Sequence, residues 1–510
     1  MSNFIPRRRF LQGAAAGGVL AGLGDLSFLS RLPAVSAADS ALDTKLVRLA
    51  DDIEPTVRLL EETPRDRLLE EVAHRVKNGL NYRELLAALL LAGVRNVQPR
   101  PSVGFKFHAV LVVNSAHLAS LSSPDEHRWL PIFWSLDYFK SSQAATARES
   151  GWRMAPVDES KVPPAHKARQ AFIDAMDKWD EGAADAAVAG LARTAGAAEV
   201  FELMWRYGAR DFRSIGHKAI FVANSWRTLQ CVGWQHAEPV LRSLAYALLN
   251  HEGDKGKPSD NDFAADRPWR KNDELAKTLR PEWREGEYKP DATAQMLEAL
   301  RGGSESDAPA KAVELLNGGA SPQSVWNAIL AAAGELPMRK AGIVALHAVT
   351  STNALRYAYD AAGDDNTRRM MLLQNASFVP LFRKALGDAP QNRIDGIEPQ
   401  PPKEGADSPK ALEEIFADVS QDRMAATRKA LAFLQANANP KPLIDAARLT
   451  VFLKGNDSHD YKYSSALLED WAHLKSPWRE RYLAAGMFLL TGSQEPDNKL
   501  VQRTRAALGA

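Results

Sequence analysis

The stretch HAVLVVNS at positions 108–115 returns as HAVTSTNA at 347–354, with His-Ala-Val and Asn at the same spacing. A third copy, HKAIFVANS at 217–225, carries one inserted residue, and HAEPVLRS at 236–243 is a looser fourth copy in which Arg replaces Asn. Recurring segments of this kind are typical of repeat architectures, whose equivalent positions line one axis or cavity. The pattern predicts a large helical array or toroid-like bundle with repeated histidine-bearing helices.

The rest of the chain also favours an all-α fold, because apolar residues recur at the three- and four-residue spacing of one helix face. The clearest stretches are 42–60, 65–77, 82–91, 166–179, 183–192, 197–207 and 412–436. Segment 105–113 suits a buried strand as well as a helix, and we favour helix because 114–121 continues without a turn residue. Loops rich in Pro, Gly, Asp, Ser and Lys are expected at 141–164, 252–273 and 388–410.

The last of these loops is the strongest candidate for a linker, because it contains Pro399, Pro401 and Pro402. We therefore expect a main helical domain of residues 42–390 that carries the histidine-bearing helices. A Pro-rich linker at 391–410 should lead to a C-terminal helical module of residues 411–510, packed on the main domain.

The N-terminus has the layout of a twin-arginine export signal. The sequence PRRRFLQ at 6–12 precedes a small apolar run at 13–23, and a signal peptidase could cut after Ala37. A Sec signal or a signal anchor with a chance arginine pair is the alternative, but the run is short, rich in Gly and Ala, and interrupted by Asp25. We expect a 1–37 signal peptide, the twin-arginine translocase as a partner, and a periplasmic or otherwise extracytoplasmic mature protein with no membrane span.

Composition excludes several classes of protein. The 64 basic and 63 acidic residues leave a net charge of +1, which argues against nucleic acid as a partner. Cys231 is the single cysteine, so c-type haem attachment and a Cys-ligated iron–sulfur cluster are excluded. Any bound metal must be held by His, carboxylates or carbonyl groups.

The histidines of the repeated segment are the candidate site residues. We hypothesise that two or more of them meet in one buried site, where His108, His217 and His347 act as ligands or bases. Neutral imidazoles can bind non-haem iron, copper, manganese or zinc. The candidate metal ligands are His108, His217, His236 and His347, and the carboxylates that could complete the shell are Asp211, Glu238 and Glu202. The alternative is that each is a core histidine with a satisfied ring proton.

The asparagines of the repeat are candidates for substrate binding. They are Asn114, Asn224 and Asn353. Seven helical positions return a side chain to within about 20° of its start, whereas six leave it about 120° away. His217 and Asn224 would therefore share a face, and one face cannot carry both residues in every copy. The segment HDYKYSS at 459–465 also groups polar residues, but a capped helix start explains it equally well.

The segment LHAVTSTNALR at 346–356, followed by MLLQ at 371–374 and FVPL at 378–381, resembles the questin oxidase-like family. The stretches GFKFH at 104–108 and IGH at 215–217 look like the other histidine-bearing stretches of that family. The resemblance implies a helical protein and, for characterised members, an oxygenase that opens one ring of a polyketide anthraquinone with a nicotinamide reductant. This chain departs from the family in its export signal and lacks a recognisable nicotinamide fold, so nicotinamide rests on the resemblance alone and the substrate class is not carried over.

Together these observations predict an exported helical oxidoreductase, related to oxygenases, with a buried histidine-lined site for a small-molecule substrate. Twelve tryptophans are many for this length and could line a pocket for a flat aromatic ligand, although tryptophan is more often core bulk. The alternative is a helical-repeat binding or scaffold protein without catalysis. A hydrolase that uses Ser115 or Ser225 is less supported, because the chain has no Gly-x-Ser-x-Gly elbow.

Overall fold

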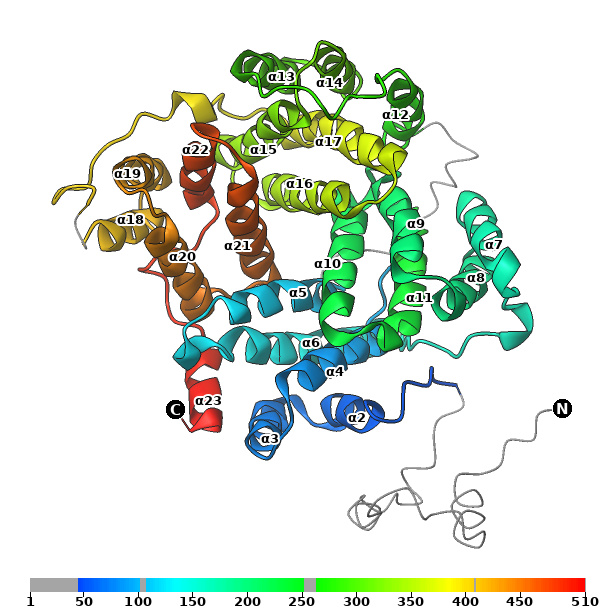
Figure 1. Ribbon diagram of the computed structural model, residues 1–510. Helices are drawn as coiled ribbons and strands as arrows, with labels where there is room; N and C mark the ends of the chain where they lie inside the picture. Colours follow the sequence, from blue (N-terminus) through cyan, green and yellow to red (C-terminus); the bar gives the residue numbers. More distant parts are fainter. Residues whose placement is uncertain (1–44, 101–106, 252–262, 408–409, 510) are drawn as a thin grey trace, which may run out of the picture. The chain divides into compact units, whose positions relative to one another are not determined.

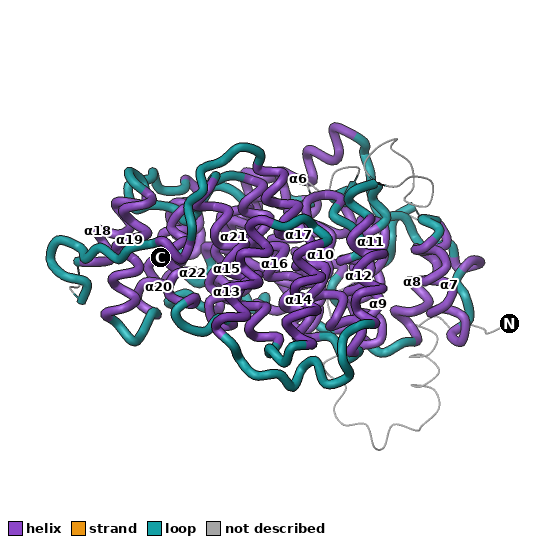
Figure 2. Tube along the Cα trace, turned by 90° about the horizontal axis from the view of Figure 1, so that it is seen from above, coloured by secondary structure: helices purple, strands orange, loops and turns teal. Residues whose placement is uncertain are grey.

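The computed structural model describes residues 45–100, 107–251, 263–407 and 410–509. These residues form α-helices, short 3-10 turns and loops, and Figure 2 shows no strand among them. The one β-type contact of the described residues is an isolated bridge between Glu287 and Ala320. The predicted all-α helical array is confirmed. The predicted export signal at 1–37 lies outside the described residues.

The first half of the chain contains ten described helices. They are α2 (Glu54–Glu62), α3 (Arg65–Lys77), α4 (Tyr82–Asn96), α5 (His108–Leu121), α6 (Leu130–Glu149), α7 (Ala165–Asp177), α8 (Glu181–Thr194), α9 (Ala197–Ala209), α10 (His217–Val232) and α11 (Ala237–Leu248). Their starts follow the local sequence: Asn81 accepts a hydrogen bond from the backbone of Glu84 at the start of α4, and Asp180 accepts one from Ala183 at the start of α8.

The second half contains twelve described helices. They are α12 (Arg267–Lys277), α13 (Pro290–Gly302), α14 (Asp307–Asn317), α15 (Pro322–Arg339), α16 (Ile343–Ala361), α17 (Asp365–Leu386), α18 (Ala411–Val419), α19 (Arg423–Ala436), α20 (Lys441–Lys454), α21 (Ser458–Asp470), α22 (Trp478–Ala485) and α23 (Lys499–Leu508). None of the described helices is both long enough and apolar enough to cross a membrane.

Several expected boundaries were wrong, each because local chemistry overrode periodicity. The helix expected at 42–60 begins at Glu54, where Pro55 occupies the first turn that proline favours. The helix expected at 412–436 is divided, because the side chain of Asp422 caps a new start by accepting from Met424 and Ala425. The loop expected at 141–164 begins after Glu149, since α6 continues through an alanine-rich stretch. Positions 252–262 of the loop expected at 252–273 lie outside the described residues, and its later part contains the start of α12 at Arg267.

Residues 47–510 form one compact unit, and four of its helices lie around a common interior. Helix α5 packs against α10, α10 against α16, α16 against α21, and α21 against α5, so the order closes on itself (Figure 1). Further helices cover this inner set: α4 and α6 pack on α5, α9 and α11 on α10, α15 and α17 on α16, and α20 on α21. Because α21 belongs to the predicted C-terminal module, that module supplies one wall of the interior.

Burial accounts for the stability of this arrangement. In α4 every residue from Leu85 to Asn96 is buried, as expected for a helix covered on all sides. Helix α3 is amphipathic instead, and buries Leu68, Leu69 and Val72 against its neighbours. Each fully buried aliphatic side chain contributes about 1.5–3 kcal/mol. The inner helices are thus held in place by a continuous apolar layer outside them.

Candidate metal centre

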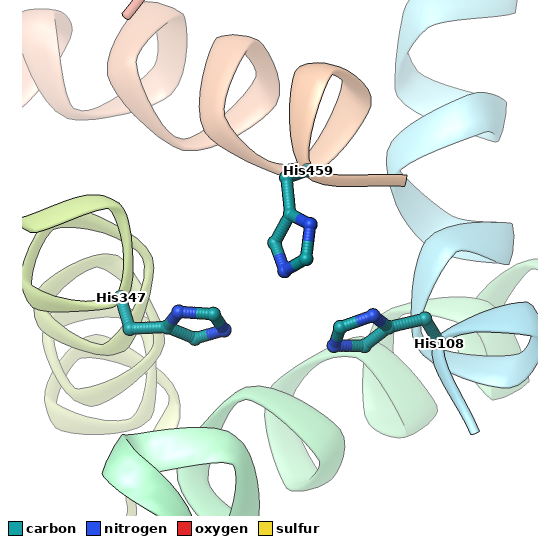
Figure 3. A group of neighbouring side chains, drawn as sticks. All are labelled: His108, His347 and His459. Atoms are coloured by element: carbon teal, nitrogen blue, oxygen red, sulfur yellow. The ribbon is translucent and has the colours of Figure 1, made fainter. Parts of the chain in front are cut away.

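Each of the four inner helices carries a histidine near its first residue. His108 and His217 begin α5 and α10, His459 is the second residue of α21, and His347 lies in the second turn of α16. All four are buried, with exposures of 2 %, 5 %, 9 % and 0 % respectively. Figure 3 shows three of them, His108, His347 and His459, pointing from separate helices toward one space. The fold therefore brings together side chains that are far apart in the sequence.

The ring nitrogens approach one another closely. The Nε2 atom of His217 lies 2.8 Å from Nε2 of His108 and 2.9 Å from Nε2 of His347. These contacts define an inner set of three rings. His459 joins it, because one ligand nitrogen each of His108, His347 and His459 lie within 4.8 Å of one another. Ligands of a single ion, at bonds of about 2.1 Å, must lie at separations of this order.

Two of these nitrogens face each other without a hydrogen between them. The Nδ1 atoms of His217 and His347 each lie 2.7 Å from a backbone carbonyl oxygen, of Ser214 and Ile343 respectively. A carbonyl oxygen only accepts, so each Nδ1 carries the ring proton and each Nε2 of the neutral ring has a lone pair. The two Nε2 atoms are nevertheless 2.9 Å apart. A cation between them, or an added proton, is needed to hold two lone pairs at that distance.

An added proton is disfavoured here. Burial lowers the pKa of His217 to about 3, and it lowers the pKa of His108 and of His347 well below the usual value. The charge of Lys462 acts in the same direction on all three rings. The rings are therefore neutral near pH 7, and the buried cluster could hold a metal ion in place of the missing proton.

His459 has the hydrogen bonding of a metal ligand on its outer nitrogen. Its Nδ1 donates to Oδ1 of Asp457 at 2.7 Å, and its Nε2 is buried without a hydrogen-bond partner. Burial alone would raise the pKa of Asp457, but the hydrogen bonds from His459 outweigh it and lower the value to about 2. An ionised carboxylate that holds the far ring nitrogen orients the imidazole and raises its basicity toward a metal.

A strained turn precedes His217 and orients its ring. Ser214, Ile215 and Gly216 have φ values of 56°, 44° and 80°, all in the left-handed region. A Cβ on Gly216 would lie 2.5 Å from Cβ of Ser351 on α16, so this position requires glycine. The turn presents the carbonyl of Ser214 to the Nδ1 of His217. Backbone strain beside a buried ligand atom is typical of functional sites.

A buried ion pair holds this turn in place. Lys218 Nζ donates to Asp211 Oδ2 and to the carbonyl of Asn250, both at 2.7 Å. The other carboxylate oxygen of Asp211 accepts the backbone N–H of Arg213 at 3.0 Å, and Asn250 Nδ2 donates to Ser214 Oγ at 2.9 Å. Burial lowers the pKa of Lys218 to about 8. The residue that follows His217 thus ties the strained turn to the scaffold.

Lys462 enters the centre from α21, one turn after His459. Its side chain is buried, and its Nζ lies 3.1 Å from Nε2 of His108. An ammonium group only donates, so while Lys462 is charged the Nε2 of His108 accepts from it and presents a third lone pair, and the Nδ1 of His108 then donates to Ser458 Oγ at 3.2 Å. Burial lowers the pKa of Lys462 to about 7.

The structure brings together three of the four histidines proposed from the sequence. His236 lies elsewhere, on the 3-10 turn Trp234–His236, where its Nε2 is 3.4 Å from the side-chain nitrogen of Gln235. It lines a surface pocket of about 370 Å³ together with Arg242. His236 is therefore not placed to join the other three, and His459 is the fourth histidine of the cluster.

The three carboxylates suggested as further ligands have other partners. Asp211 pairs with Lys218, Glu238 pairs with Arg193, and Glu202 accepts from the backbone of Gly363. The carboxylate of the centre is Asp457, which acts through His459 rather than from the inner shell. Among the described residues, the groups that could coordinate a metal in this cluster are thus imidazoles.

The repeated asparagines tie the inner helices together. Asn224 Nδ2 donates to the carbonyl of Leu111 at 2.8 Å, and Asn114 Nδ2 lies 3.5 Å from Asn224 Oδ1, so α5 and α10 are bridged. Asn353 Nδ2 donates at 2.8 Å to the carboxylates at the end of α21, those of Glu469 and Asp470. Their hydrogen bonds serve helix packing, which leaves their proposed role in substrate binding without a contact that supports it.

Sequence reasoning did not find His459 and Lys462 as members of the site. Both lie outside the repeated His-Ala-Val pattern, and the segment around them was explained by a capped helix start. That explanation is also correct, because Asp457 and Asp460 form a capping box at the start of α21. The spacing of His459 and Lys462, three residues apart on one helix face, was the available signal.

Comparison of the chain with protein-family models, with curated proteins and with solved structures finds no match. The resemblance to the questin oxidase-like family therefore stays a prediction from short motifs.

Proposed function

We propose that His108, His217, His347 and His459 bind one transition-metal ion, and that the protein is a metal-dependent oxidoreductase acting on a small molecule. The observation that carries the proposal is that the unprotonated Nε2 atoms of His217 and His347 face each other at 2.9 Å, with the Nε2 of His108 2.8 Å from that of His217. Rings packed only as core histidines would each need a donor for that nitrogen, and lone pairs facing each other repel.

The atoms around the ligands support the same proposal. Metal-bound histidines donate their other ring nitrogen to a carbonyl or a carboxylate. His217 and His347 donate to carbonyls, and His459 donates to the carboxylate of Asp457. These bonds fix the tautomer that leaves Nε2 free, so the site is arranged for a metal before any metal arrives.

The ligand set favours copper, iron or zinc over magnesium, calcium or manganese. Imidazole nitrogen suits the first group, whereas the second group prefers carboxylate and carbonyl oxygen. Among divalent ions, copper binds most tightly to a site made of nitrogen. We therefore take copper as the first ion to test and iron as the second, since both can exchange an electron with a substrate and zinc cannot.

The compartment and the substrate follow from the sequence pattern rather than from the fold. The twin-arginine layout at 6–12 supports export of a protein that folds around its cofactor first. The resemblance to the questin oxidase-like family supports oxidative chemistry on an aromatic substrate. We therefore propose an exported oxidoreductase that binds its metal at the histidine centre before export.

The decisive experiment is the metal content of the purified protein. The chain should retain one equivalent of copper or iron after loading and gel filtration, as measured by inductively coupled plasma mass spectrometry. A copper-loaded sample should show nitrogen hyperfine splitting in its electron paramagnetic resonance spectrum. His217→Gln should lose the metal, because Gln lacks the converging nitrogen.

The matched control is His236→Gln, which changes a buried histidine outside the cluster and should keep the wild-type stoichiometry. Loss of metal in His236→Gln with retention in His217→Gln would contradict the ligand assignment. Only trace metal in the wild-type protein, after loading with copper, iron and zinc in turn, would overturn the proposal.

A further inference from the structure

The ammonium of Lys462 is buried, and no carboxylate of the described residues pairs with it. Among the described residues, no ion pair within 4.0 Å involves Lys462. The charge of Asp457 acts on it, but the Asp457 carboxylate is hydrogen-bonded to His459. Its one hydrogen-bond acceptor among the described residues is the Nε2 of His108, at 3.1 Å. By contrast, Lys218 is equally buried and is satisfied by both a carboxylate and a carbonyl.

Metal binding would take that acceptor away. If Nε2 of His108 coordinates an ion, as the proposed function requires, its lone pair can no longer accept from Lys462. A buried ammonium without an acceptor is strongly unfavourable. The metal-loaded centre therefore needs another acceptor near Nζ.

The position of Lys462 indicates where that acceptor must lie. Its Nζ is 3.1 Å from a nitrogen that would be about 2.1 Å from the metal, so the ammonium would lie within about 5 Å of the ion. A ligand atom bound to the metal on that side would be within hydrogen-bonding distance of the ammonium. One atom can thus contact both.

The electrostatic environment of the centre favours a negatively charged ligand. The helices α5, α10 and α21 all begin at the cluster, and each N-terminus carries positive partial charge. The ligands are neutral imidazoles, so they do not compensate the charge of the metal or that of Lys462. An anion would compensate both, and charge-assisted bonds to an anionic oxygen are strong.

We infer that the centre binds its exogenous ligand as an anion, through an oxygen that contacts both the metal and the ammonium of Lys462. The ligand class is a small molecule with an anionic oxygen: a carboxylate, a deprotonated phenol, or hydroxide formed from water. This inference rests on the proposed metal site and names the class of ligand that the site takes.

The test uses full-length protein loaded with copper and the probes acetate and acetamide, which have the same size and differ in charge. Acetate should perturb the copper spectrum with saturable affinity, and acetamide should not. Lys462→Met should weaken acetate binding by about ten- to a hundredfold, the usual contribution of a hydrogen bond to a charged group. Lys462→Arg should recover most of it, because the positive charge is kept.

A pH titration of the copper spectrum without any probe separates the two sources of anionic oxygen. A spectral change with rising pH that persists in Lys462→Arg, whose guanidinium keeps its charge, and is lost in Lys462→Met would identify hydroxide as the ligand, and its absence would leave the organic anion. Both results support the inference. Equal affinity for acetate in wild type and Lys462→Met, with one copper bound in each, would overturn it and leave the metal site standing. Failure of the wild type to bind any metal would overturn both.

Discussion

Two buried polar clusters lie one residue apart in the chain, and they are built on opposite principles. At Lys218 the buried charge is matched, because Asp211 and the carbonyl of Asn250 accept from its ammonium. At His217 the Nε2 atoms of neighbouring rings face each other at 2.8 Å and 2.9 Å, and Lys462 has no carboxylate partner among the described residues. The polar groups of the first cluster are matched within the protein, whereas those of the second are the groups to which we assign the proposed metal. The comparison distinguishes a structural network from a candidate binding site.

The largest expected effect is that of low pH on the free energy of unfolding, because the buried histidines resist protonation. His217 stays neutral in the folded state down to its pKa of about 3, whereas in the unfolded chain it takes up a proton as the pH falls through 6.5. The unfolded state then binds more protons, so the free energy of unfolding falls below pH 6.5 by up to about 1.4 kcal/mol per pH unit. The same direction of shift in His108 and His347 brings the total to about 4 kcal/mol per unit.

Urea unfolding of the metal-free protein between pH 7 and pH 5 measures this slope. His217→Gln should flatten it by about a third, since one of three titrating rings is removed. His166→Gln, at an exposed position on α7, should leave it unchanged. A wild-type slope of zero below pH 6.5 would show that the rings are protonated in the folded state as well.

The two buried lysines should respond to the same substitution by very different amounts. Lys218→Met leaves the carboxylate of Asp211 buried without its cation, which should lower the free energy of unfolding by about 3–5 kcal/mol. Lys462→Met removes an equally buried charge but leaves no carboxylate of the described residues without its cation, and should change the free energy of unfolding by less than about 1 kcal/mol. Chemical denaturation of the two variants compares them directly. Equal losses of stability in the two variants would contradict the distinction between the Lys218 cluster and the histidine cluster.

Asp457→Asn should weaken the centre without unfolding it. Asn caps a helix about as well as Asp, so the start of α21 should persist. The neutral side chain no longer strengthens His459 as a ligand, and metal affinity should fall by about ten- to a hundredfold. A competition titration with a chelator gives the affinity, and circular dichroism checks the fold. Unchanged affinity would place His459 outside the ligand set.

Asn114→Ala should have the smallest effect. Its hydrogen bond to Asn224 is long, at 3.5 Å, and its own side-chain oxygen is buried without a partner. Loss of this side chain should change the free energy of unfolding by about 1 kcal/mol or less and leave metal affinity unaltered. A large loss of substrate turnover at normal metal content would restore the interpretation of the asparagines as substrate-binding residues.

The repeated His-Ala-Val segment allowed the fold class and three of the buried histidines to be predicted. Periodicity was sufficient there because the helices around the centre are long and apolar. It did not predict the division at Asp422, where one capping side chain decides the break. Helix ends depend on such single hydrogen bonds, which apolar spacing does not encode.

The remaining part of the site could not be read from the sequence, because it depends on which helices become neighbours. His236 matched the repeat and lies apart, whereas His459 and Lys462 did not match it and lie in the centre. Motif similarity reports on local sequence, but a ligand set is defined by tertiary contacts. The lone-pair arrangement that carries the proposed function became visible only with the partners of each Nδ1 atom.

The hydrogen bond between Ser458 and His108 joins positions 350 residues apart. The wall of the interior that α21 forms can therefore close only after the chain has been synthesised as far as this helix. A nascent polypeptide that stops before Ser458 has at most three of the four imidazoles and lacks Lys462. The histidine cluster can consequently assemble only after the other three helices that contribute to it have all been made.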